Sequence, residues 1–199
     1  MTSNTKNVTV LTSVLLLCGM PVAWYLNQHA WHEDSLNETL RLTARSALLI
    51  YLLIFIARPL RQLTANSLSR WLVANRRYLG ISFAAVMIAH LYLLVTLNGV
   101  QLLNSGVLVY LLILLMLLTS FDRPTAALGP KRWKILHKTG LYVIGIALAQ
   151  AQFTRIAQGV GEPVHYLLAA LILIAIGIRM AAWRKQRIAA GPAGELASR

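Results

Sequence analysis

Acidic residues and cysteine are scarce in this sequence. Among 199 residues there are 6 Asp and Glu against 19 Lys and Arg, and charged residues make up only 13% of the chain. That content is too low for an ordinary soluble domain. The single cysteine, Cys18, falls inside an apolar run, which excludes a disulfide framework or a thiolate metal site within one chain.

Nucleotide-binding glycine motifs are also missing. Neither a Walker A loop nor a Rossmann glycine fingerprint occurs, so nucleotide chemistry on this chain is not expected. The formal net charge of +13 would suggest nucleic acid in a soluble protein, but here the basic residues lie in short loops beside long apolar runs. Membrane lipid and membrane topology explain that distribution better, and we expect no nucleic-acid partner.

Long apolar runs dominate the sequence. Hydrophobic residues form 57% of the chain, and the mean hydropathy is +0.61. A bilayer core about 30 Å thick requires about 20 apolar residues in a helix. We therefore predict an all-α bundle of six transmembrane helices, at residues 8–26, 42–57, 79–97, 107–121, 136–153 and 164–182. Residues 1–188 are expected to form a single domain, and residues 189–199 a flexible cytoplasmic tail.

The charges of the loops predict the orientation. The segment between the second and third runs carries Arg58, Arg61, Arg70, Arg76 and Arg77 with no acid. The segment between the fourth and fifth runs is also basic, whereas the alternate loops are poor in base. Because basic loops stay in the cytoplasm, both termini are predicted to lie there, with the chain in a bacterial inner membrane. A short interfacial helix is expected around Leu68–Val73.

His90 is the clearest candidate for a functional group at membrane depth. An ionisable group inside a span is costly and is a functional hypothesis by default. His90 lies ~16 Å along the third run from Leu79, with apolar neighbours. A neutral imidazole is a natural ligand for haem iron and also suits a proton relay. A structural histidine bonded to a neighbouring helix is the alternative.

Two arginines are candidates for the same kind of site. Arg76 precedes His90 by about four helical turns, so both residues can share a helix face at a separation of about 21 Å. That spacing suits two stacked haems, although Arg76 equally suits a topology charge that extends to lipid headgroups. Arg45, in the outer part of the second run, could pair with a haem propionate.

The fifth and sixth runs add three polar candidates. His137 opens the fifth run near the cytoplasmic side, where a histidine is usually just hydrated. Gln150 lies at the outer level of the same run, and such an amide is more often an interhelical hydrogen-bonding group than an iron ligand. His165 begins the sixth run on the outer side.

Two stretches resemble a known family. Residues 76–80 read Arg-Arg-Tyr-Leu-Gly ahead of His90, and residues 128–137 read Leu-Gly-Pro-Lys-Arg-Trp-Lys-Ile-Leu-His. This pattern resembles the ferric-reductase-like transmembrane domain. Within that family it is most similar to the haem-binding membrane subunits of bacterial periplasmic methionine sulfoxide reductase systems. The resemblance covers roughly residues 40–155.

The resemblance implies electron transfer through one or two b-type haems, by an electron-transfer subunit rather than a self-contained enzyme. Electrons would arrive from a quinol or a cytoplasmic flavin reductase, with quinone or FMN as further cofactors, and would leave to a periplasmic reductase partner. His90 would ligate the outer haem iron, and His137 an inner one with Arg76 opposite it. The family pattern expects a second histidine where this sequence has Gln150, and His165 is the other candidate for that ligand.

Two other functions stay open at this point. A haem-free or single-haem structural or assembly subunit of a larger membrane complex would use the same scaffold and would tolerate changes at His90 and His137. A small-solute transporter is less favoured, because the helices are not visibly broken in matching halves and the spans hold no acid for ion coupling.

Overall fold

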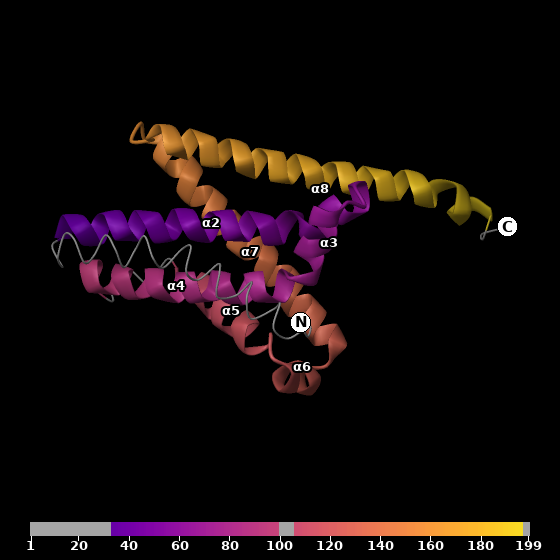
Figure 1. The fold of residues 1–199 in the computed structure, drawn as a ribbon, viewed down its shortest axis with the longest axis horizontal. Helices are drawn as coiled ribbons and strands as arrows, with labels where there is room; N and C mark the ends of the chain where they lie inside the picture. Colours follow the sequence, from indigo (N-terminus) through magenta and orange to yellow (C-terminus); the bar gives the residue numbers. More distant parts are fainter. Residues whose placement is uncertain (1–32, 100–105, 197–199) are drawn as a thin grey trace. The chain divides into compact units, whose positions relative to one another are not determined.

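The computed structural model describes residues 33–99 and 106–196. These ranges form α2 (Glu33–Leu63), α3 (Ser67–Ala74), α4 (Arg76–Asn98), α5 (Val107–Leu118), α6 (Asp122–Leu128), α7 (Pro130–Ala157) and α8 (Pro163–Leu196) (Figure 1). No strand occurs within them, so the all-α prediction is confirmed for the described residues. The predicted first span, residues 8–26 with Cys18, lies outside them.

Three of these helices are long and apolar enough to cross a membrane. They are α2, α4 and the part of α8 from Pro163 to Ala189, and they contain the predicted runs 42–57, 79–97 and 164–182. α5 and α6 pass the same test together, as a pair bent by 105°. The described residues thus hold three candidate spans, or four if the bent pair is one span. Six spans with cytoplasmic ends stay a prediction.

The helices at the predicted fourth and fifth runs differ from a simple span. α5 has 12 residues, or ~18 Å of helix, and the chain turns into α6 soon afterwards. α7 has 28 residues but is not among the helices apolar enough to span. Its composition explains this, because its central part carries His137, Lys138, Gln150 and Gln152.

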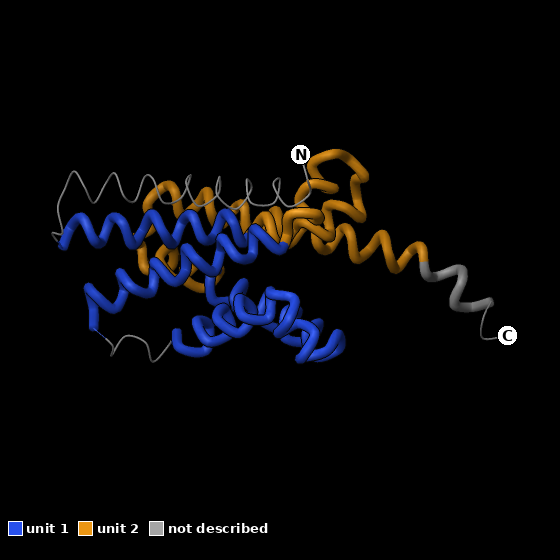
Figure 2. Tube along the Cα trace, turned by 60° about the horizontal axis from the view of Figure 1, so that its bottom comes forward, with its two compact units in different colours: residues 1–51, 77–148 blue, residues 52–76, 149–199 orange. Residues whose placement is uncertain are grey.

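The helices group into two compact units (Figure 2). Unit 1 comprises Met1–Tyr51 and Arg77–Leu148, and unit 2 comprises Leu52–Arg76 and Ala149–Arg199. α2 and α7 each contribute to both units. The backbone of α8 continues to Leu196, into the segment predicted as a tail. One domain for residues 1–188 and flexibility beyond it stay predictions.

Tyr51 joins three helices of unit 1. Its side chain is buried, and its hydroxyl donates to the carbonyl of Leu141 on α7 over 2.7 Å. A Cβ at Gly145, one turn further along α7, would collide with this hydroxyl, so a glycine is needed for the close approach. The ring of Phe83 on α4 lies 6.0 Å from that of Tyr51, centroid to centroid. One aromatic side chain therefore contacts both helices that carry the predicted histidine ligands.

A proline inside α2 shapes unit 2. Pro59 has no N–H to donate to the carbonyl of Phe55, four residues earlier. Arg179 of α8 donates to that carbonyl over 3.1 Å, and its guanidinium carbon lies 4.3 Å from the centroid of the Phe55 ring. The arginine replaces the hydrogen bond that the proline removes. α2 consequently runs through Pro59 to Leu63, beyond the predicted end of the second span at residue 57.

Side chains of unit 2 also complete two helix ends. Lys185 of α8 donates to the carbonyl of Gln62 over 3.0 Å, one of the last carbonyls of α2. At the start of α8, the backbone N–H of Glu162 donates to Nδ1 of His165 over 3.1 Å. With Pro163 at the first helical position, this contact matches one of the two hydrogen bonds of a capping box, with a histidine in place of Glu or Gln. Both contacts satisfy backbone groups that a helix end leaves without partners.

Candidate functional site

His90 lies on α4 against α2, within unit 1. Its Nδ1 is 2.9 Å from Oγ1 of Thr43. That hydroxyl is also 3.0 Å from the carbonyl of Thr39 and 2.9 Å from the carbonyl of Leu40. The single hydroxyl hydrogen is directed at one of these two carbonyls, so we assign the hydroxyl oxygen as the acceptor of Nδ1–H of His90. The backbone of Leu40 is a further hydrogen-bond partner of the His90 ring. This tautomer leaves a lone pair on Nε2, to which no side chain of the described residues hydrogen-bonds.

Thr43 ends a row of buried hydroxyl groups on α2. Ser35, Thr39 and Thr43 follow one another at intervals of four residues, and all three are buried. Thr39 donates to the carbonyl of Ser35 over 2.8 Å, and Thr43 repeats the pattern one turn later. Sequence reasoning missed this row. Its only signal was a hydroxyl at every fourth position, which places all three on one helix face.

His137 is held more completely than His90. Its Nε2 is 3.0 Å from Oγ1 of Thr119, the residue that ends α5. The Thr119 hydroxyl donates to the carbonyl of Leu115 over 2.7 Å, so its oxygen accepts from Nε2–H of His137. The ring of Trp133 stacks on the imidazole at 4.3 Å, and the indole N–H donates to the Thr119 carbonyl over 2.9 Å. His137 and Trp133 therefore fasten the start of α7 to the end of α5.

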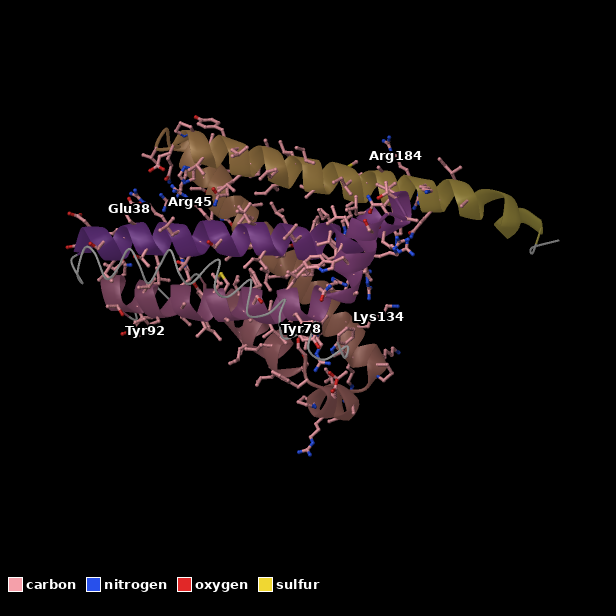
Figure 3. The ribbon with its side chains drawn as sticks, in the orientation of Figure 1. Glu38, Arg45, Tyr78, Tyr92, Lys134 and Arg184 are labelled. Atoms are coloured by element: carbon pink, nitrogen blue, oxygen red, sulfur yellow. The ribbon has the colours of Figure 1, made fainter. Side chains whose placement is uncertain are left out.

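The remaining predicted site residues are divided between the units. Arg45 belongs to unit 1, half-buried on α2 two residues after Thr43, and extends from the same end of α2 as Glu38 (Figure 3). Arg76 is half-buried at the start of α4 and belongs to unit 2. His165 is buried in unit 2, where its Nδ1 is already occupied by the N–H at the start of α8. The structure thus brings His90, His137 and Arg45 into one unit.

The two glutamines of α7 have opposite surroundings. Gln150, at the position where the family resemblance expects histidine, is exposed. Gln152 is buried, and its Oε1 has no hydrogen-bond partner among the described residues. Oγ of Ser82 on α4 is likewise buried and without a partner there. The amide that could accept a hydrogen bond inside the protein is thus Gln152 rather than Gln150.

Arg179 is a further charged residue at membrane depth that sequence reasoning missed. It lies within the predicted sixth span, and its contacts with Phe55 give it a structural role in unit 2. The sequence signal was the pairing of a helix-internal proline with an arginine in another apolar run. Such a pair is visible only once the two helices are known to be neighbours.

The described residues contain no group of three or more His, Cys, Asp or Glu side chains that could hold a bare metal ion. A porphyrin supplies four nitrogen ligands itself, so a haem iron needs only one or two from the protein. Single histidines on different helices, as found in the described ranges, are compatible with haem iron.

The relatives found by comparison with known proteins include two haem-binding subunits of the same name. The chain is 27% identical over 201 residues to the "Protein-methionine-sulfoxide reductase heme-binding subunit MsrQ" of Cronobacter sakazakii, covering 92% of this chain and 94% of the relative. It is 28% identical over 177 residues to the subunit of the same name from Salmonella arizonae, covering 81% and 86%. No family model matches the chain, and no solved structure matches it. The apolar helices and these relatives together point to a multi-pass membrane protein.

Proposed function

We propose that the chain is an MsrQ-like haem protein of the bacterial inner membrane, which passes electrons from a cytoplasmic-side donor to a periplasmic acceptor. The relatives are named as heme-binding subunits, and their similarity extends over most of this chain. The observation that carries the proposal is the hydrogen bond between Nδ1 of His90 and Oγ1 of Thr43. With Nδ1 of His90 bonded to Thr43, the lone pair of Nε2 would be the one that binds iron.

His90 has the features of a haem ligand. A metal-binding histidine usually donates its second ring N–H to a neighbouring acceptor, which fixes the ring and raises its basicity. Thr43 is such an acceptor, and it is buried on a helix whose own carbonyls orient its hydroxyl. His90 itself is half-buried. The residues present therefore fit a b-type haem bound through Nε2 of His90.

His137 fits a haem less well than His90 does. Its Nε2 donates to Thr119 and its ring is stacked on Trp133, so iron ligation through Nε2 requires the loss of the Thr119 hydrogen bond. We therefore propose a single haem at His90, with His137 fastening α5 to α7. Gln150 and His165 stay predictions as further iron ligands, and in His165 Nδ1 already accepts from the backbone N–H of Glu162.

When bound, the haem would supply one-electron redox chemistry, and the residues of this chain would hold and tune it. His90 would bind the iron, Thr43 would orient the imidazole, and Arg45 would neutralise a propionate. Arg76 would lie at the cytoplasmic side, where a quinol or a flavin reductase would donate electrons. Quinone or FMN would be the further cofactor on that side, and a methionine sulfoxide reductase would be the periplasmic partner.

The first test is an absorption spectrum of the purified chain. The proposal predicts a red preparation with a Soret band, an α band that appears on reduction, and protohaem in a pyridine haemochrome assay. A colourless but folded preparation would contradict the proposal.

Topology is tested separately with alkaline phosphatase fusions. Fusions after Gly99 and Gly159 should be active, because both positions are predicted to be periplasmic, whereas a fusion after Gly129 should be inactive.

A haem-free assembly subunit is the second candidate function. One observation favours it: each of the three histidines in the described ranges already has a protein hydrogen-bond partner. In that case His90 and Thr43 would form another interhelical contact. A folded, haem-free preparation that co-purifies with a stable membrane partner would support this function over electron transfer.

A further inference from the structure

The short helix α3 is hydrogen-bonded to the turn that connects it to α2. Oγ of Ser69 donates to the carbonyl of Thr64 over 2.6 Å, and its backbone N–H donates to Oδ1 of Asn66 over 2.8 Å, which caps the helix start. At the other end, the N–H of Asn75 donates to the carbonyl of Trp71 over 2.9 Å. Local hydrogen bonds therefore set the direction of α3 before any partner binds.

α3 has a protein-facing stripe and an apolar stripe without a protein cover. Ser69, Leu72 and Asn75 are buried at intervals of three residues. Leu68 and Trp71, on the adjacent stripe, are 57% and 43% exposed, with no covering element among the described residues. A tryptophan and a leucine exposed beside the end of an apolar span are typical of the boundary between headgroups and acyl chains.

Cations surround this stripe. The exposed basic residues of unit 2 at this end are Arg58, Arg61, Arg70, Arg184, Lys185 and Arg187. The hydrogen bond from Lys185 to Gln62 places residues 183–187 of α8 against the end of α2, and nitrogen atoms gather around α3 and this part of α8 (Figure 3). Residues 52–76 and 163–189 contain no acid, so nothing in these segments neutralises the cluster.

We propose that α3 and the adjoining end of α8 form a binding surface for anionic phospholipid, here called the lipid shelf. Leu68 and Trp71 contact the acyl region, and Arg61 and Arg70 bind the phosphodiester of the headgroup. One N–H of Arg70 already donates to the carbonyl of Ala65, which holds its guanidinium in place while other donors stay available. The lipid shelf would fix the depth of α2 and α8 in the cytoplasmic leaflet, independently of haem.

The charge pattern favours an anionic lipid over a zwitterionic one. A lipid with a net negative headgroup offers the phosphate oxygens that arginine forks bind well, without a competing ammonium group. Juxtamembrane Lys and Arg residues each add measurably to the affinity for anionic lipid, and two of them together account for about thirtyfold. An acyl chain also matches the exposed Leu68 and Trp71, which a soluble anion would leave uncovered.

Native mass spectrometry of the full chain tests the lipid shelf, with phosphatidylglycerol and phosphatidylcholine added at equal concentration. The wild type should retain phosphatidylglycerol preferentially, and 0.5 M salt should reduce its retention. The double variant Arg61→Gln/Arg70→Gln should bind phosphatidylglycerol about thirtyfold more weakly. A matched control, Arg123→Gln/Arg132→Gln, removes the same charge from exposed positions of unit 1 and should bind like the wild type.

Trp71→Ala separates the apolar contact from the charges and should weaken retention of both lipids. Equal retention of the two lipids by the wild type would overturn the proposal, as would equal losses in the test and control variants. If the arginine variant does not fold, the salt dependence and lipid preference of the wild type decide the question alone. Absence of haem from the same preparations would reject the proposed function without affecting this result.

Discussion

Unit 1 and unit 2 use their polar side chains differently. In unit 2, Arg179, Lys185 and His165 each hydrogen-bond to a backbone group that a proline or a helix end leaves without a partner. In unit 1, the Thr43 hydroxyl also lies within hydrogen-bond distance of backbone carbonyls, but it bonds to the His90 side chain as well. Nε2 of His90 keeps no side-chain partner among the described residues. A polar group at membrane depth therefore has to be explained first as a backbone partner, and only then as a functional group.

The two histidines of unit 1 differ in the ring nitrogen that forms a hydrogen bond. Each is bonded to a threonine of another helix, but through different ring nitrogens: Nδ1 in His90 and Nε2 in His137. His137 also carries the stacked ring of Trp133. A histidine on an apolar helix is thus not a ligand by position alone, since the nitrogen that its partner occupies decides what it can still bind.

The largest effect is expected when the acceptor beside His90 is removed. Thr43→Val keeps the side-chain shape but loses the hydroxyl, so Nδ1–H of His90 loses its partner and the ring its orientation. Haem affinity, measured by titration of haem into the haem-free protein, should fall about 10- to 100-fold. Thr43→Ser restores the hydroxyl and should recover most of the affinity. An unchanged haem affinity in Thr43→Val would show that the hydrogen bond to Thr43 does not distinguish His90 from His137 as a haem ligand.

The next largest effect is expected on protein stability when Arg179, the donor to the Phe55 carbonyl of α2, is replaced. Arg179→Met removes the hydrogen bond that Arg179 donates to the Phe55 carbonyl and should lower the free energy of unfolding by about 2 kcal/mol. In a Pro59→Ala background, the new N–H can bond to that carbonyl, so the same substitution should cost less. Thermal melting in detergent of the wild type, the two single variants and the double variant gives the coupling energy between Arg179 and Pro59. Equal costs in both backgrounds would show that Arg179 acts independently of the proline.

A smaller effect is expected at His137. His137→Phe keeps a ring to stack on Trp133 but loses the hydrogen bond to Thr119, which should lower the free energy of unfolding by about 1 kcal/mol. The loss should be non-additive with Thr119→Val, because both variants remove the same contact. Haem content should not change. Additive losses would show that His137 and Thr119 do not act through a shared contact. A loss of haem would show that His137 also contributes to haem binding.

Much of the fold follows from hydropathy and local signals. The predicted second, third and sixth runs lie within α2, α4 and α8, because an apolar stretch of that length forms a helix almost regardless of its surroundings. A short helix predicted around Leu68–Val73 is found as α3, Ser67–Ala74, and its place at the membrane interface stays a prediction. Its boundaries follow from the capping residue Asn66 and the closing Asn75, which are local features.

The features that sequence reasoning missed depend on contacts between distant segments. The second span was predicted to end at residue 57, but Arg179, 120 positions after Pro59, allows the helix to continue through the proline. The bend of 105° between α5 and α6 was also not foreseen. For the candidate site, sequence reasoning placed His90 ahead of His137, and only the family resemblance implied that both bind haem iron. Their ranking depends on Thr43 and Thr119, and only the packing of helices brings those residues close.

The haem-to-protein ratio of His90→Ala beside that of His137→Ala tests the central claim most directly. Both variants are purified as full chains under identical conditions, and their folding is checked by circular dichroism and melting temperature. We expect His90→Ala to be folded and almost free of haem, and His137→Ala to carry as much haem as the wild type. Full haem content in His90→Ala, or an equal loss in both variants, would contradict the account.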